Sequence, residues 1–147
     1  MNDSYDHPTE VPLTFAQKGT LVLESLPVVF SSLALLFVLT RFGPLTGEPP
    51  PLFIIIFLIV LTLFFAWIAL NCIRDLISGV ALMREDILET SRRLGRTARS
   101  RSFTGQFKQM GEMRLTPHAY GQGQHGSRYR VLYSPASKIV WSLDQGA

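Results

Sequence analysis

One uninterrupted apolar segment, residues 51–73, limits what this chain can fold into. It reads PLFIIIFLIVLTLFFAWIALNCI, and between Leu52 and Leu70 only Thr62 breaks the run of apolar side chains. A helix of about 20 residues crosses the ~30 Å hydrocarbon layer of a bilayer, because each residue adds ~1.5 Å. The rest of the 147-residue chain offers no second large core that could bury such a segment. The sequence therefore predicts a transmembrane helix, with a polar extension, at 51–78.

A second apolar run precedes this segment and predicts another transmembrane helix at 20–42. Glu24 and Arg41 lie near its two ends, where charged side chains can reach the lipid headgroups. Ser31 and Ser32 form one small polar face. Small residues allow close packing between membrane helices, but the same hydroxyls can also bond to the backbone of their own helix. Both interpretations of the two serines stay open at the level of the sequence.

The two predicted spans are joined by the short segment 43–50, GPLTGEPP. Its Gly and Pro residues interrupt the helix, so the spans form an antiparallel hairpin with both chain ends on one side. Arg74, Arg84 and Arg92 follow the second span, whereas only Arg41 borders the extracytoplasmic loop. The positive-inside rule then predicts an integral protein of the plasma (inner) membrane with both termini in the cytoplasm.

Charge divides the chain into an acidic first half and a basic second half. Residues 1–73 carry two Lys or Arg and five Asp or Glu, whereas residues 74–147 carry twelve and six. The N-terminal cytoplasmic tail, 1–19, is acidic and contains two prolines ahead of any periodic pattern. We therefore expect this tail to be loosely ordered or to dock on a partner.

Residues 79–147 show the pattern of a small cytoplasmic β domain. Apolar and polar residues alternate in 129–133 and 138–143, as half-buried strands require. Residues 102–115 predict a hairpin, and the Gly-rich segment 116–128 predicts a loop with room for one helical turn. The predicted fold is a two-helix transmembrane hairpin followed by a small antiparallel β-barrel or sheet of four to five strands.

The strongest functional signal in this half is the basic segment 92–101, RRLGRTARSR, which we expect to be a loop. It fits a solvated linker, and it also fits contact with anionic lipid, where each arginine near the surface contributes roughly 1 kcal/mol. Nucleic acid is a weaker candidate ligand, because no aromatic residues for base stacking are interleaved with the arginines. The candidate headgroup contacts are Arg92, Arg93, Arg96, Arg99 and Arg101.

Residue types that carry catalysis or bind metals are present but scattered. Glu85 and Asp86 are adjacent, so their side chains point apart, and we expect a solvated pair. His118 and His125 have no acidic neighbour to complete a metal site. Cys72 is the single cysteine, which excludes an intrachain disulfide and a thiolate cluster. The sequence therefore predicts no catalytic residue, no cofactor and no metal, and a protein that is not an enzyme.

A strand–turn–strand signature resembles that of a group of bacterial proteins. The chain reads Tyr129-Arg-Val-Leu-Tyr-Ser-Pro-Ala-Ser-Lys138, followed by Trp141-Ser-Leu-Asp144, and Gly79-Val follows the second predicted helix directly. This is similar to uncharacterised small bacterial membrane proteins that couple a two-helix hairpin to a C-terminal β domain. The resemblance covers Asp75 onward and, more loosely, the hairpin, and the chain departs from it in the His-containing loop 117–126.

The resemblance bears on one ambiguous segment and on the fold. Residues 80–94, VALMREDILETSRRL, fit a helix as well as a strand by periodicity, and the resemblance implies a strand. A second resemblance, in topology only, is to membrane-tethered oligonucleotide/oligosaccharide-fold domains that work beside stomatin-like partners. Neither resemblance brings catalytic residues.

Two functions are consistent with these observations. The first is a non-enzymatic accessory, assembly or stabilising subunit of a larger membrane complex, whose β domain caps or docks on other integral membrane subunits. It follows from the small size of the β domain, which buries a modest share of its surface and gains stability by docking. The alternative is a free-standing, membrane-tethered β-barrel that binds anionic lipid, peptide or nucleic acid.

Overall fold

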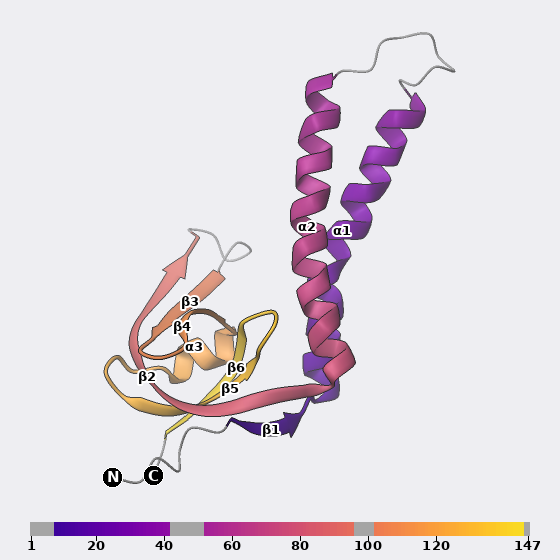
Figure 1. The fold of residues 1–147 in the computed structure, drawn as a ribbon. Coiled ribbons are helices and arrows are strands. Elements are labelled where there is room, and N and C mark those ends of the chain that lie inside the picture. The colour runs from indigo at the N-terminus through magenta and orange to yellow at the C-terminus, as the bar shows by residue number, and fades with distance from the viewer. Residues whose placement is uncertain (1–7, 42–51, 96–101, 146–147) are drawn as a thin grey trace. The chain divides into compact units, whose positions relative to one another are not determined.

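The computed structural model describes residues 8–41, 52–95 and 102–145. The chain divides into two compact units, one formed by residues 15–77 and the other by residues 1–14 together with 78–147. Among the described residues, those of the first unit form only helix, and every strand belongs to the second unit (Figure 1). We call the second unit the β domain.

The helical unit consists of two long helices, α1 (Phe15–Arg41) and α2 (Leu52–Ser78). Each has 27 residues and reaches about 40 Å at the helical rise, so both are long and apolar enough to cross a membrane. Helix α1 begins five residues before the predicted span, because extending an existing helix adds a hydrogen bond with no new nucleation cost. Gly79 ends α2 with a φ of 67°, a left-handed conformation that glycine adopts without strain.

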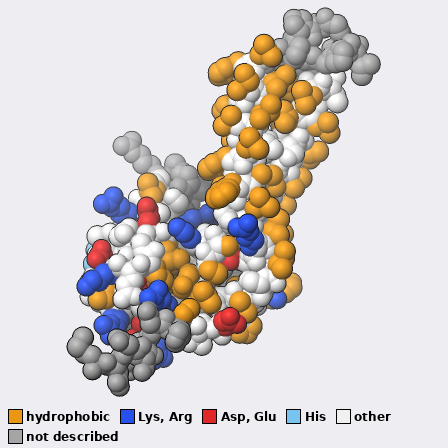
Figure 2. Space-filling view, in the orientation of Figure 1, with side chains coloured by type: hydrophobic (Ala, Val, Ile, Leu, Met, Phe, Trp, Pro, Cys, Tyr) orange, Lys and Arg blue, Asp and Glu red, His pale blue; other side chains and the backbone are white. Residues whose placement is uncertain are grey.

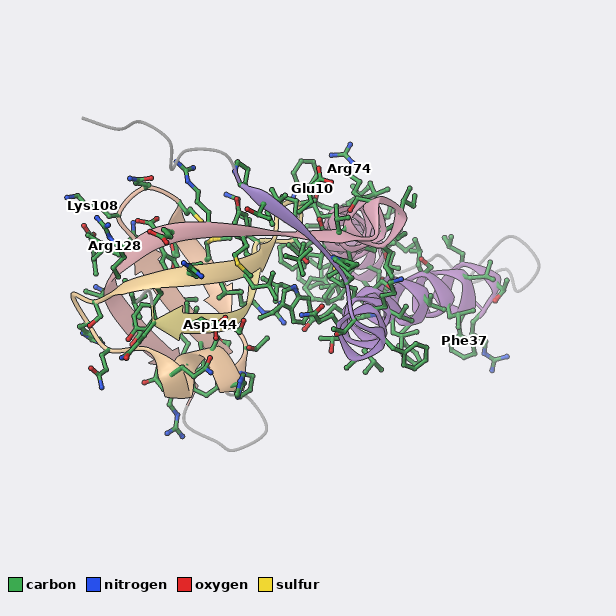
Figure 3. All side chains as sticks on the ribbon, turned by 90° about the horizontal axis from the view of Figure 1, so that it is seen from below. Glu10, Phe37, Arg74, Lys108, Arg128 and Asp144 are labelled. Atoms are coloured by element: carbon green, nitrogen blue, oxygen red, sulfur yellow. The ribbon has the colours of Figure 1, made fainter. Side chains whose placement is uncertain are left out.

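The side chains of these helices are mostly exposed, and the exposed ones are mostly large and apolar. Figure 2 shows this apolar surface along both helices. Phe37, for example, is 67% exposed and points away from α1 (Figure 3). In an 18-residue apolar stretch of each helix, only 11% of the residues of α1 and 6% of those of α2 are buried. Water does not favour such a surface, whereas lipid or other apolar helices cover it without cost.

The described part of the β domain contains six strands and one short helix. Their order in the sheet is β1-β2-β3-β4-β6-β5, and β2 also pairs with β5. All pairings are antiparallel except that of β4 with β6, which is parallel. The elements are β1 (Thr9–Pro12), β2 (Val80–Leu94), β3 (Ser102–Phe107), β4 (Gly111–Leu115), α3 (Pro117–Gln122), β5 (Arg128–Ser134) and β6 (Ile139–Gln145).

Two features of this sheet differ from the prediction. The expected sheet was wholly antiparallel, but β6 lies parallel to β4, because α3 and β5 intervene and carry the chain back before β6 begins. The expected strand count was four to five, and the additional strand is β1, from the segment predicted to be a loose tail. Residues Thr9–Pro12 pair in register with Val80–Met83, and the Leu13 N–H donates to the Gly79 carbonyl at 2.9 Å.

The ambiguous segment 80–94 is a strand along its whole length. β2 is the longest strand of the domain, and it pairs in turn with β1, β5 and β3 (Figure 1). Its register shifts between Leu88 and Thr90, a bulge that bends the strand so that one segment can serve several partners. The strand continues through Arg92 and Arg93 to Leu94, so the predicted loop 92–101 is wrong for its first three residues. Pairing with Phe103 and Thr104 of β3 extends the ladder there.

The core of the β domain lies between the strands and α3. Gly105 on β3 faces it, and a Cβ at that position would lie 3.0 Å from Leu115 Cδ1. Thr116 starts α3 by accepting a hydrogen bond from the Ala119 N–H, and its hydroxyl donates to the Trp141 carbonyl. The buried side chains that pack together in this core are Leu88, Phe107, Met113, Leu115, Ala119, Tyr129, Val131, Val140 and Leu143.

Candidate functional site

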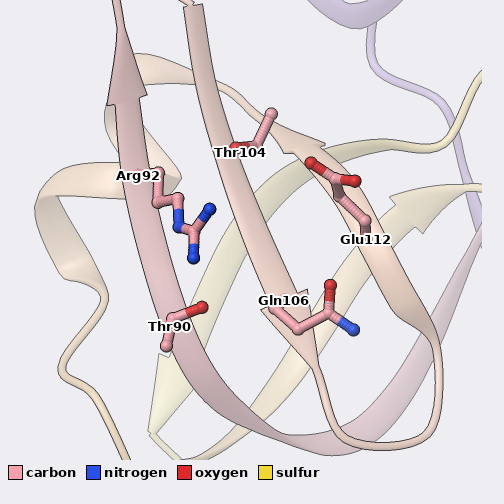
Figure 4. A pocket seen from close by; sticks show the side chains of 5 residues that line it. All are labelled: Thr90, Arg92, Thr104, Gln106 and Glu112. Atoms are coloured by element: carbon pink, nitrogen blue, oxygen red, sulfur yellow. The ribbon is translucent and has the colours of Figure 1, made fainter.

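A half-open polar hollow lies on the outer face of β2, β3 and β4. Its volume is about 290 Å³. Polar side chains from the three neighbouring strands line it (Figure 4): Thr90, Arg92, Thr104, Gln106 and Glu112. We call it the β2–β4 hollow.

The strand register explains why these side chains gather on one face. Thr90 pairs with Gln106, and Gln106 pairs with Glu112, so these three residues form one row across the strands. Arg92 pairs with Thr104 and begins the next row. Residues directly opposite each other on antiparallel strands share a face, and alternate residues point to the other side. The intervening side chains therefore point into the core, as Phe107, Met113 and Leu115 do.

The two charged side chains of the hollow are not paired with each other. Across the described ranges, the five lining side chains make no hydrogen bond or ion pair with another protein group. Arg92 and Glu112 are both exposed, one on β2 and the other on β4. The hollow thus offers guanidinium donors at one place, carboxylate acceptors at another, and two hydroxyls and an amide beside them.

Sequence reasoning singled out one of these five residues, Arg92, and missed the other four. The signal that could have found them is the strand alternation itself. Thr104 and Gln106 occupy alternate positions on one predicted strand, and Glu112 is one residue from the start of the next. Without the register between β2 and β3, which contains a bulge, the sequence does not place Thr90 and Arg92 beside them.

The five arginines predicted to contact lipid are only partly described. Arg92 and Arg93 lie on β2, both exposed, and by alternation they point to opposite faces of the strand. Arg92 lines the hollow, and Arg93 does not. Arg96, Arg99 and Arg101 lie outside the described residues, as does most of the predicted basic loop. Headgroup contact by these arginines stays a prediction.

The predicted helix-packing serines have different environments. Ser31 is 6% exposed, whereas the side chain of Ser32 lies on the exposed surface of α1. Both hydroxyls donate to the Val28 carbonyl of their own helix, at 3.0 Å and 2.8 Å. Each serine therefore satisfies its hydroxyl locally, and packing against another helix stays a prediction for both.

The adjacent acids Glu85 and Asp86 do point apart, but they are not a solvated pair. Glu85 forms an exposed ion pair with Arg130 on β5, in which Arg130 Nε lies 3.3 Å from Glu85 Oε1. Asp86 is only 4% exposed, and its carboxylate accepts hydrogen bonds from the backbone N–H groups of Ile87, Gln109 and Met110. The prediction of a solvated pair is wrong for Asp86, because the β3–β4 turn folds over it.

The histidines and the cysteine considered as metal ligands lie in separate parts of the fold. His125 Nε2 lies 3.0 Å from the Ser91 hydroxyl, and His118 is on α3. Cys72 is buried in α2. Within the described ranges, no group of three or more His, Cys, Asp or Glu side chains is positioned to hold a metal ion. Lys108 and Arg128 project outward from the β domain (Figure 3).

Comparison with protein families, curated proteins and solved structures found no match for this chain.

Proposed function

We propose that this chain is an integral membrane protein whose two helices cross the bilayer as a hairpin. The pairing of β1 with β2 carries this proposal. β1 precedes α1 in the chain, and β2 follows α2, yet Val11 and Ala81 are directly paired. Two segments that pair must lie on the same side of a membrane. If both helices cross the bilayer, the N-terminal strand and the rest of the β domain therefore share one side.

We place that side in the cytoplasm, at the plasma (inner) membrane. The support is the distribution of basic residues. Twelve of the fourteen Lys and Arg residues lie at position 74 or later, in the last turns of α2 and in the β domain. Basic residues close to spanning segments are retained on the cytoplasmic side.

We also propose that the β domain is a small barrel. β2, β3, β4, β6 and β5 each pair with the next strand, and β5 pairs again with β2, so that each of the five has two neighbours. The helix α3 between β4 and β5, and the parallel pairing of β4 with β6, agree with the five-stranded oligonucleotide/oligosaccharide-binding architecture.

The role we propose is that of an accessory subunit that packs against other integral membrane subunits. An aromatic ridge on α2 supports it: Phe53, Phe57, Phe64 and Trp67 are between 56% and 82% exposed. At 100° per residue these four lie within roughly 80° of one another around the helix axis. Large aromatic side chains gathered on one exposed face are typical of the residues that dominate protein–protein contacts.

The test is purification from native membranes in mild detergent. We expect stoichiometric partners to remain with the wild-type protein, and we expect Phe57→Ala with Phe64→Ala to reduce their retention at least about tenfold, as loss of buried aromatic contacts does. The matched control is Ile59→Ala with Ile73→Ala, which removes side chains of 43% and 42% exposure that lie at least about 80° around the helix axis from the aromatic ridge. A wild-type protein that purifies as a clean monomer would count against the accessory role.

A further inference from the structure

We propose that the β2–β4 hollow binds a small zwitterion, a molecule that carries both an anionic group and a primary ammonium group. The proposal concerns the β domain alone and does not depend on the accessory role. The hollow presents one charge of each sign, Arg92 and Glu112, and neither is paired within the described chain.

The charges select the class of ligand. Arg92 offers a planar set of N–H donors that matches a phosphate or carboxylate. Glu112 offers acceptors that match an ammonium group. A simple anion would gain at Arg92 and be repelled by Glu112, and a simple cation would meet the reverse. Only a molecule with both groups gains at both positions.

The dimensions limit the size of that molecule. β3 lies between β2 and β4, and neighbouring strands are ~4.8 Å apart, so the backbones that bear Arg92 and Glu112 are separated by roughly 10 Å. Both side chains are long enough to shorten this span (Figure 4). A volume of about 290 Å³ is at the lower end for small-molecule sites. The hollow therefore fits a single small molecule or one lipid headgroup.

The neutral side chains complete the match. Thr90, Thr104 and Gln106 supply hydroxyl and amide groups that both donate and accept, between or beside the two charges. A phosphoethanolamine group has this combination of phosphate, linking oxygen and ammonium. It occurs free in solution and as the headgroup of phosphatidylethanolamine, and the two sources share the chemistry that the hollow recognises.

The experiment is a ligand-observed NMR titration of the full-length protein in detergent micelles, with phosphoethanolamine and phosphocholine as probes. We expect phosphoethanolamine to bind at least about tenfold more tightly, because the quaternary ammonium of phosphocholine has no N–H to donate to Glu112. Arg92→Gln and Glu112→Gln should each weaken phosphoethanolamine binding by roughly tenfold. Arg93→Gln and Glu89→Gln change charge by the same amounts outside the hollow and should leave binding unchanged.

Equal binding of the two probes, or binding that Arg92→Gln and Glu112→Gln leave intact, would overturn the proposal. All four substituted side chains are exposed, so unfolding temperatures should match the wild type and confirm that each variant is folded. The source is distinguished by repeating the titration in nanodiscs. Weaker apparent binding of the soluble probe in phosphatidylethanolamine discs than in phosphatidylcholine discs assigns the hollow to the lipid headgroup, whereas equal binding assigns it to the soluble zwitterion.

Discussion

At the scale of single residues, Asp86 has the clearest structural role in the β domain. Its buried carboxylate lies on β2 and accepts from Gln109 and Met110, in the turn that joins β3 to β4. Arg84 reaches the same turn, where its guanidinium donates to the Gln109 side chain at 3.0 Å. The turn between two strands is thus held by a third strand that precedes both of them.

Replacing Asp86 by Ala should destabilise the β domain by about 1–3 kcal/mol, because three backbone N–H groups lose their acceptor. The measurement is the urea dependence of Trp141 fluorescence in a Trp67→Phe background, since Trp141 is buried in β6. Glu85→Gln is the matched control and should cost less than 1 kcal/mol, since it removes only an exposed ion pair. An Asp86→Ala variant as stable as Glu85→Gln would contradict this role.

Sequence reasoning succeeded at this scale where the information is local. Alternation identified the inward residues of β5 and β6, such as Val131 and Leu143, because a strand buries every second side chain. It failed for Asp86, since an acid in a strand reads as solvated unless the turn that covers it is known. The hollow was missed for the same reason: Thr90 and Glu112 are 22 positions apart in sequence and meet only through the sheet register.

At the scale of elements, β1 is the strand that the sequence could not reveal. It has four residues, includes Pro12, and pairs with a partner about seventy positions later. Such a short segment carries almost no periodic signal, and its strand conformation comes from the pairing partner. The helices present the opposite case: their apolar runs are long and continuous, so two long apolar helices were predicted from the sequence.

The β1–β2 pairing can be tested by cross-linking. In a Cys72→Ala background, Val11→Cys with Ala81→Cys should form a disulfide on mild oxidation, because directly paired residues have Cα atoms within the 4.4–6.8 Å that a disulfide spans. The product is a looped chain that migrates differently on a non-reducing gel. Val11→Cys with Met83→Cys is displaced by two residues in register and should cross-link far less. Equal yields for the two pairs would show that β1 is not held in this register.

At the scale of the whole molecule, two independent observations support a membrane hairpin. The lengths and apolar surfaces of α1 and α2 suit a bilayer, and the β1–β2 pairing requires that the segments flanking the two helices meet. A hairpin that crosses the membrane twice satisfies both conditions. The predicted loop 43–50 lies outside the described residues.

Labelling of single cysteines in intact cells tests this topology most directly. In a Cys72→Ala background, Thr46→Cys marks the segment between the helices, and Lys108→Cys marks the exposed β3–β4 turn. With a membrane-impermeant maleimide, the account predicts that the cysteine at position 46 reacts in intact cells and the one at 108 reacts only after permeabilisation. Reaction of both positions in intact cells, or of neither until the membrane is opened, would contradict a two-span hairpin with a cytoplasmic β domain.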